Sequence, residues 1–185
     1  MINVNDLKTG LTIIVDNHLY QVLEFLHVKP GKGSAFVRTK LKDLRTKAII
    51  EHTFNSSIKV EKAIVNKQKV EYIYNTGHDY VFMKLDTYEQ LNISKDLIKE
   101  EIKYLKENLK VELLFFNQEL LGINLPDNVE YQVIETEPAV RGNTATTALK
   151  EAKIETGLIV KVPLFIEEGE TIIVSTKDSK YVSRK

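Results

Sequence analysis

Short runs of β-branched and large apolar residues, separated by turn residues, dominate the chain. In the first third such runs cover residues 12–15, 18–27, 34–42, 48–54 and 58–64. Asp16-Asn17 lies between the first two runs, and Lys29-Pro30-Gly31-Lys32-Gly33 follows the second, and both have the composition of tight turns. Four or five strands within about 65 residues favour a small barrel.

The pattern continues in the rest of the chain. A second set of strand-like runs covers residues 65–74, 80–85, 110–116 and 119–125. A helix is predicted over about residues 95–108, because Ser94 can cap its start and apolar residues recur at helical spacing at Ile98, Ile102, Leu105 and Leu109. A third set of runs covers residues 129–135, 157–162, 171–175 and 181–182, with a long polar loop over 137–153.

This alternation predicts an all-β protein of three small barrels with one short helix in the middle one. The expected domains are residues 1–63, 64–127 and 128–185, and Leu125-Pro126-Asp127-Asn128 has the composition of a boundary. Domains of this size bury limited cores, and the boundaries lack Gly/Ser linkers, so close packing of neighbouring domains is expected.

Charge is unevenly distributed, although the chain holds 26 Lys or Arg and 26 Asp or Glu and has no net charge. Residues 1–62 carry ten cations against six acids, a net charge of +4. The excess of positive charge is greatest over residues 29–47, which contain seven Lys or Arg and only one acidic residue, Asp43. A solvated strand face is one interpretation, and a polyanionic partner of the first third is the other.

Composition excludes several classes of protein. Because the chain has no cysteine, disulfide scaffolds, thiolate nucleophiles, iron–sulfur clusters and Cys-based zinc sites are ruled out. No apolar run approaches the roughly 18 residues of a membrane span, and the N-terminus lacks the apolar stretch of a signal peptide. A cytoplasmic protein without a membrane partner is therefore expected.

The sequence offers no recognisable catalytic or metal site. The four histidines, His18, His27, His52 and His78, lack metal-ligand spacing. Gly31-Lys32-Gly33-Ser34 is not a phosphate-binding loop, because Leu26 and Gly33 stand where that motif needs Gly and Ser or Thr. We therefore expect no catalytic residue, no metal and no cofactor, and the chain is not predicted to be an enzyme.

The turn after the second run has its own chemistry. Pro30 fixes one φ angle, and Gly31 and Gly33 permit tight or left-handed geometry on both sides of Lys32. The prediction is a narrow hairpin tip with one long cation at its apex. An ordinary surface turn remains the alternative at this point.

Several motifs together resemble one known family. The stretch from His27 to Arg38, with Lys40, Leu41, Leu44 and Arg45-Thr46 after it, closely resembles the first domain of bacterial elongation factor P. Further matching motifs follow in order along essentially the whole chain: Tyr80-Val81-Phe82-Met83, Tyr88-Glu89-Gln90, Glu135-Thr136-Glu137-Pro138, Glu155-Thr156-Gly157-Leu158, Val162-Pro163-Leu164-Phe165-Ile166, Glu168-Gly169 and Tyr181-Val182-Ser183-Arg184.

The resemblance implies an L-shaped, tRNA-like protein with an SH3-like (KOW-type) first barrel and two OB-type barrels. Members of the family bind the ribosome between the peptidyl and exit sites and relieve stalling at consecutive prolines. The archaeal and eukaryotic hypusine-containing factor resembles the first two domains only, so residues 129–185 favour the bacterial form.

Site residues follow from the resemblance position by position. Lys32 matches the functional tip lysine, which many members carry in modified form, so a lysine-modifying enzyme is an expected partner. Lysylation, an aminopentanol-type addition and no modification all remain open. Lys29, Pro30, Gly31 and Gly33 form the tip loop. The expected RNA contacts are Arg38, Lys40, Lys42 and Arg45 in the first domain and Gly142, Asn143, Thr144, Tyr181 and Arg184 in the third. Many members have Asp where Asn143 stands.

These features predict a monomeric translation factor that acts by positioning. Proline reacts poorly and constrains the nascent chain, so a rigid arm that holds the acceptor end of the peptidyl-site tRNA can bring the reacting groups near attack geometry. The expected partners are ribosomal RNA, that tRNA and the exit-site codon of the message. A general OB/SH3-type RNA-binding protein without a ribosomal role is the alternative, and an enzyme with an unrecognised site is a third.

Overall fold

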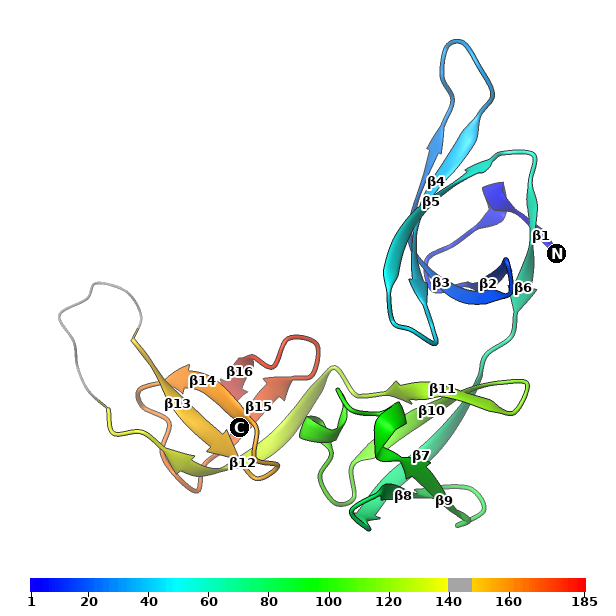
Figure 1. Ribbon diagram of the computed structural model, residues 1–185. Coiled ribbons are helices and arrows are strands. Elements are labelled where there is room, and N and C mark those ends of the chain that lie inside the picture. Colours follow the sequence, from blue (N-terminus) through cyan, green and yellow to red (C-terminus); the bar gives the residue numbers. More distant parts are fainter. Residues whose placement is uncertain (140–147) are drawn as a thin grey trace. The chain divides into compact units, whose positions relative to one another are not determined.

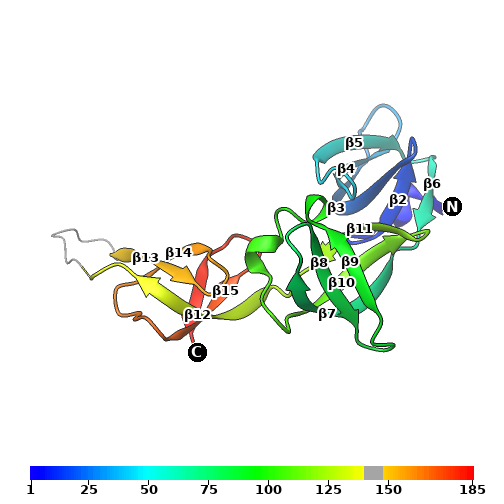
Figure 2. The same cartoon turned by 60° about the horizontal axis from the view of Figure 1, so that its bottom comes forward.

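The computed structural model describes residues 1–139 and 148–185 of the chain (Figures 1 and 2). The described residues form sixteen strands in three sheets, with helix present only as three short 3₁₀ segments. The predicted all-β class is thereby confirmed. Within these ranges, no helix has the length and apolarity needed to cross a membrane.

The first sheet has the strand order β1-β6-β2-β3-β4-β5. Its strands are β1 (Ile2–Asn3), β2 (Thr12–Val15), β3 (His18–Val28), β4 (Phe36–Asp43), β5 (Ile49–Asn55) and β6 (Lys59–Ala63), and the 3₁₀ helix η1 (Val4–Asp6) follows β1. Asp16 and Asn17 both adopt positive φ, and Val15 pairs with His18, so the predicted tight hairpin is confirmed. Side chains from η1 and from five of the strands, among them Val4, Ile13 and Leu41, meet in one buried core.

The second sheet has the order β11-β10-β7-β8-β9. Its strands are β7 (Asn66–Asn75), β8 (Asp79–Lys84), β9 (Gln90–Ser94), β10 (Lys110–Phe116) and β11 (Glu119–Asn124). The strand β9 was not predicted, although its alternation of polar and apolar residues is typical of a half-buried strand.

The helical region of the middle domain is confirmed in place, but it is shorter than predicted. It consists of the single-turn 3₁₀ helices η2 (Lys95–Leu97) and η3 (Ile102–Tyr104). A continuous α-helix would use the carbonyl groups of Lys103 and Tyr104 within itself. Here they instead accept hydrogen bonds from the hydroxyls of Thr156 and Tyr131, at 2.7 and 2.6 Å.

The third sheet has the order β14-β13-β12-β15-β16. Its strands are β12 (Asn128–Thr136), β13 (Leu149–Ile154), β14 (Ile159–Pro163), β15 (Thr171–Ser175) and β16 (Tyr181–Arg184). The prediction of a loop through residue 153 is wrong, because β13 begins at Leu149. Lys150 occupies an inward position of β13 beside Ala152 and Ile154, which hides the strand's alternation in the sequence.

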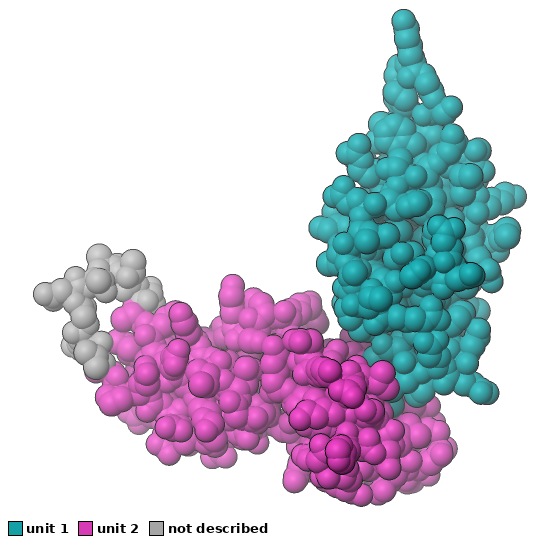
Figure 3. All heavy atoms as spheres, viewed as in Figure 1, with its two compact units in different colours: residues 1–67, 113–122 teal, residues 68–112, 123–185 magenta. Residues whose placement is uncertain are grey.

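The chain contacts divide the molecule into two compact units (Figure 3). Unit 1 comprises residues 1–67 and 113–122, and unit 2 comprises residues 68–112 and 123–185. The first barrel therefore forms one unit with the end of the β10–β11 hairpin. The domain boundaries expected from the sequence, after residues 63 and 127, stay a prediction.

Candidate functional site

A long hairpin formed by β3 and β4 carries the predicted tip. The two strands pair as far as Val28 and Phe36, so that residues 29–35 form the connecting loop. β5 follows β4 only to the base of this loop, where Phe36 pairs with Asn55 and the Ser56 amide donates to the Ala35 carbonyl at 3.0 Å. The connecting loop therefore extends beyond the strands of its sheet, and the space-filling view shows unit 1 tapering to a narrow end (Figures 1 and 3).

The tip loop exposes Lys32 to solvent between its two glycines. Gly33 has a φ of +109°, a conformation that side-chain-bearing residues rarely adopt, whereas Gly31 does not have positive φ. Nothing lies within 4 Å of a Cβ placed on Gly31, and only the Pro30 ring lies that near Gly33, at 3.8 Å. Among the described residues no hydrogen bond or ion pair involves the Lys32 side chain. The ammonium group is therefore free to reach a partner outside the chain.

A row of three cations follows the tip along β4. Because side chains alternate across a strand, Val37, Thr39, Leu41 and Asp43 face inward and are buried. The outward positions between them belong to Arg38, Lys40 and Lys42. Their spacing places positive charge at every second residue of a single strand, which is an arrangement suited to a run of phosphates.

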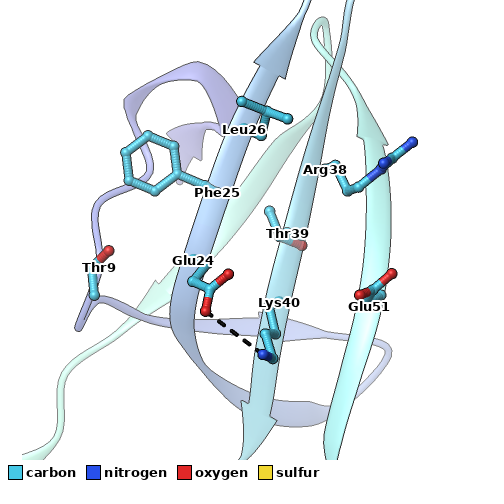
Figure 4. Close-up of a pocket in the computed structure, with 8 residues that line it drawn as sticks. All are labelled: Thr9, Glu24, Phe25, Leu26, Arg38, Thr39, Lys40 and Glu51. Carbon is cyan, nitrogen blue, oxygen red and sulfur yellow. Dashed lines mark ion pairs between the residues drawn. The ribbon is translucent and has the colours of Figure 1, made fainter.

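An open hollow lies beside this row on the first sheet (Figure 4). It is lined by Thr9, Glu24, Phe25, Leu26, Arg38, Thr39, Lys40 and Glu51. Lys40 points to Glu24 on β3, with Nζ and Oε1 3.6 Å apart, while Arg38 extends away from that pair in Figure 4. The Glu24 side chain is 74% exposed and that of Lys40 42%, so the pair contributes little stability.

Arg45 lies beyond the end of β4 and differs from the other predicted RNA contacts. Its Nε and Nη2 atoms donate to the two carboxylate oxygens of Glu119, each at 2.9 Å, and its Nη1 donates to the Asn17 carbonyl at 3.3 Å. The hydrogen bonds with Arg45 hold the pKa of the Glu119 carboxyl below its usual value, and Glu119 raises the pKa of Arg45. The fork-to-fork geometry commits this guanidinium to a partner within the chain.

Asp43 organises the turn that carries Arg45. Its carboxylate accepts hydrogen bonds from the backbone amides of Arg45 and Thr46, at 2.8 and 2.9 Å, and lies 3.0 Å from Nδ1 of His18. Burial alone would raise the pKa of this carboxyl, but the bonds from Thr46, His18 and Arg45 together lower it. An ionised carboxylate therefore fixes the turn.

The predicted sites of the third domain are separate from this surface in the sequence. Tyr181 is half-buried on β16 and pairs with Val174 of β15. Nη1 of Arg184 lies 3.2 Å from Oε1 of Glu170, and the guanidinium lies over the Phe165 ring at 5.5 Å. Gly142, Asn143 and Thr144 lie outside the described residues.

The partners of these cations could not be predicted from the sequence. Glu119 is 74 residues from Arg45, and no local pattern indicates that the two residues pair. The role of Asp43 could have been predicted, because an Asp side chain commonly accepts hydrogen bonds from backbone amides two and three residues later in a turn. Within the described ranges, no three His, Cys, Asp or Glu side chains are grouped as metal ligands.

Three family descriptions match the chain in succession. Residues 3–60 match the elongation factor P KOW-like domain, residues 65–123 match the elongation factor P OB domain, and residues 129–184 match the elongation factor P C-terminal domain. An elongation factor P from Phytoplasma australiense is 54% identical over 185 residues, which is all of this chain and 98% of the relative.

Solved structures show a related fold. The eukaryotic translation initiation factor 5A from Methanococcus jannaschii is 27% identical, with a TM-score of 0.53 over 67% of this chain and 93% of its own. A translation initiation factor eIF-5A family protein from Naegleria fowleri has a TM-score of 0.51, covers 67% of this chain and 96% of its own, and is 18% identical, so it shows similarity of fold alone.

Proposed function

The chain belongs to the elongation factor P family of translation factors, and on that premise we propose how it acts. It binds the ribosome beside the peptidyl-tRNA, stimulates peptide bond formation and relieves stalling at consecutive prolines. The observation that carries this proposal is the free ammonium of Lys32 at the end of a narrow hairpin, with a row of cations leading to it.

The geometry supports a division of labour along the hairpin. Arg38, Lys40 and Lys42 bind phosphates of the tRNA acceptor end or of ribosomal RNA, and these contacts fix the register of the protein on the RNA. Lys32 then reaches the peptidyl-transferase centre, and a modifying enzyme that extends its side chain would add reach and hydrogen-bond donors. The segment holding Gly142, Asn143 and Thr144 contacts the exit-site codon, and Tyr181 and Arg184 contact RNA.

The chemistry assigned to the protein is positioning. Holding the acceptor end of the tRNA in place shortens the search for attack geometry, and good orientation of two reactants lowers a barrier by several kcal/mol. This mechanism asks for no acid, base, metal or cofactor from the chain. It asks for a tip of fixed geometry, and the left-handed φ of Gly33 is one element of that geometry.

Translation of a message with consecutive prolines in a reconstituted bacterial system tests the proposal. The protein is purified from its own cells, so that any modification is present, and is compared with Lys32→Ala and with Lys8→Ala, an exposed lysine that follows η1 and lies outside the tip. Wild type and Lys8→Ala should relieve the stall, and Lys32→Ala should not. Relief by Lys32→Ala would overturn the role of the tip.

Co-sedimentation with ribosomes separates the proposal from a general RNA-binding role. A translation factor should bind ribosomes in preference to unrelated RNA at the same salt concentration. Equal binding to both, with a steep salt dependence and no relief of stalling by the wild type, would favour the general RNA-binding protein.

A further inference from the structure

Two cations of the turn between β4 and β5 point to the end of the β10–β11 hairpin. Arg45 makes the bidentate pair with Glu119 described above. Nζ of Lys47 donates to the Leu44 carbonyl at 2.8 Å and to the Leu121 carbonyl at 2.9 Å. All of these residues belong to unit 1. Both cations were counted among the seven that indicate a polyanionic partner, yet each is bound within the chain.

Lys47 occupies a backbone conformation that favours glycine. Its φ is +65°, so a lysine at this position is strained compared with glycine. Only the side chain distinguishes the two residues, and the Lys47 side chain is what joins the turn to β11. The absence of a side chain at Gly122 makes room for the same contact, since a Cβ added there would lie 2.8 Å from the Lys47 ammonium.

An apolar cluster lies in the same region of unit 1. Leu19, Leu44, Ala63 and Leu121 are buried together, and Leu114 and Phe116 of β10 pack against them. The turn is also tied to β3, because the Leu44 amide donates to the Leu19 carbonyl at 2.9 Å. Apolar contacts thus stabilise the packing of the hairpin end, and the directional hydrogen bonds of the two cations fix its orientation.

We propose that Arg45 and Lys47 are positioning residues, which clamp the end of the β10–β11 hairpin to the first barrel and do not contact RNA. The proposal rests on the function proposed above. The tip loop precedes β4 and the clamp directly follows it. The clamp therefore anchors β4 at the end opposite the tip. The cations left to face RNA along this hairpin are Lys29, Lys32, Arg38, Lys40 and Lys42.

The salt dependence of ribosome binding separates a phosphate contact from a clamp. Each phosphate contact that is lost lowers the slope of log K against log salt by about 0.7–0.9. Arg38→Gln, at an exposed position of the basic row, serves as the matched control and should lower the slope by that amount. Arg45→Gln should leave the slope unchanged and reduce the maximal rate of stall relief. An equal loss of slope in both variants would overturn the proposal.

Charge reversal gives a second, independent test. Arg45→Glu alone should impair stall relief several-fold, because two carboxylates then face each other. Adding Glu119→Arg should restore most of that activity if the pair acts within the chain. A double variant as poor as Arg45→Glu would mean that the cation is needed at position 45 itself, as an RNA contact requires, and would overturn the clamp.

Amide hydrogen exchange on the isolated protein tests the clamp without the ribosome. Lys47→Gly removes the ammonium and relieves the backbone strain, so the variant should remain folded while the amides of residues 119–122 exchange several-fold faster. Unchanged exchange there would overturn the role of Lys47. If the wild type fails to relieve stalling, the proposed function fails, and this measurement still decides whether the clamp exists.

Discussion

The hydroxyl group of Tyr131 holds the third sheet to the 3₁₀ segment of the second domain, and its removal should have a measurable cost. Tyr131 is fully buried, and its hydroxyl donates to the Tyr104 carbonyl at 2.6 Å. Burial raises the pKa of Tyr131, so the hydroxyl keeps its proton and donates at neutral pH. Tyr131→Phe preserves the ring and leaves that carbonyl without this donor. A lost hydrogen bond costs about 1 kcal/mol, and an unsatisfied buried carbonyl brings the total to about 2 kcal/mol.

Native-state amide exchange is the suitable assay, because a chain with several domains need not unfold in one step. The amides to follow are those of β15, where Ile172 pairs with Tyr131 and Val174 pairs with Val129. A loss of about 2 kcal/mol in opening free energy raises their exchange rates about thirtyfold. Tyr74→Phe is the control, since Tyr74 is 46% exposed. Equal rates in Tyr131→Phe and the control would refute the reasoning.

Three further predictions follow from other contacts. Gly33→Ala should impair stall relief, because φ of +109° is strained for alanine by roughly 1–3 kcal/mol, while Gly31→Ala should retain activity; equal activities would contradict this. The lowered pKa of Asp43 stabilises the fold above the unfolded-state pKa of about 3.9, and this stability is lost as pH falls through the folded-state value. Urea unfolding should therefore depend less on pH below about 4 in Asp43→Asn than in the wild type. Gly122→Ala should displace the Lys47 ammonium and accelerate amide exchange at residues 119–122, and unchanged exchange would argue against that contact.

Local patterns predicted the parts of the fold that depend on local chemistry. Asp16 and Asn17 tolerate left-handed backbone, so the hairpin between β2 and β3 could be recognised from two residues. The alternation in β4 is visible in the sequence, and it is this period of two that places Arg38, Lys40 and Lys42 on one face. The Lys-Pro-Gly-Lys-Gly turn predicted the tip because its glycines and proline restrict backbone geometry directly.

Contacts between distant residues decided what the sequence could not predict. The residues from Ser94 to Leu109 have helical spacing, but hydroxyl groups of Tyr131 and Thr156 take the carbonyls that a helix would need. In β13, the aliphatic stem of Lys150 fills a buried position, and the sequence does not indicate this burial because lysine is a polar residue. The candidate site shows the same limit, because nothing near Arg45 in the sequence indicates Glu119 as its partner.

The length of β3 leaves a strand edge that needs protection. On the side away from β4, its pairing with β2 ends at Gln21, and one further pair of backbone bonds joins Leu11 and Gly10 to Val22. No described strand covers that side of the residues beyond, and Phe25 and Leu26 are exposed there at 37% and 58%. Bare edges of this kind invite pairing between copies of a protein and lead to aggregation.

Three features of the hairpin work against such self-association. The register shift between Val22 and Glu24 bends the strand away from a flat edge, Glu24 adds a charge to that stretch of β3, and Pro30, in the loop after the strand, offers no amide to extend a ladder. The hairpin thus has an open strand edge, and its bulge, its charged residue and its proline make that edge less suited to pairing with another strand.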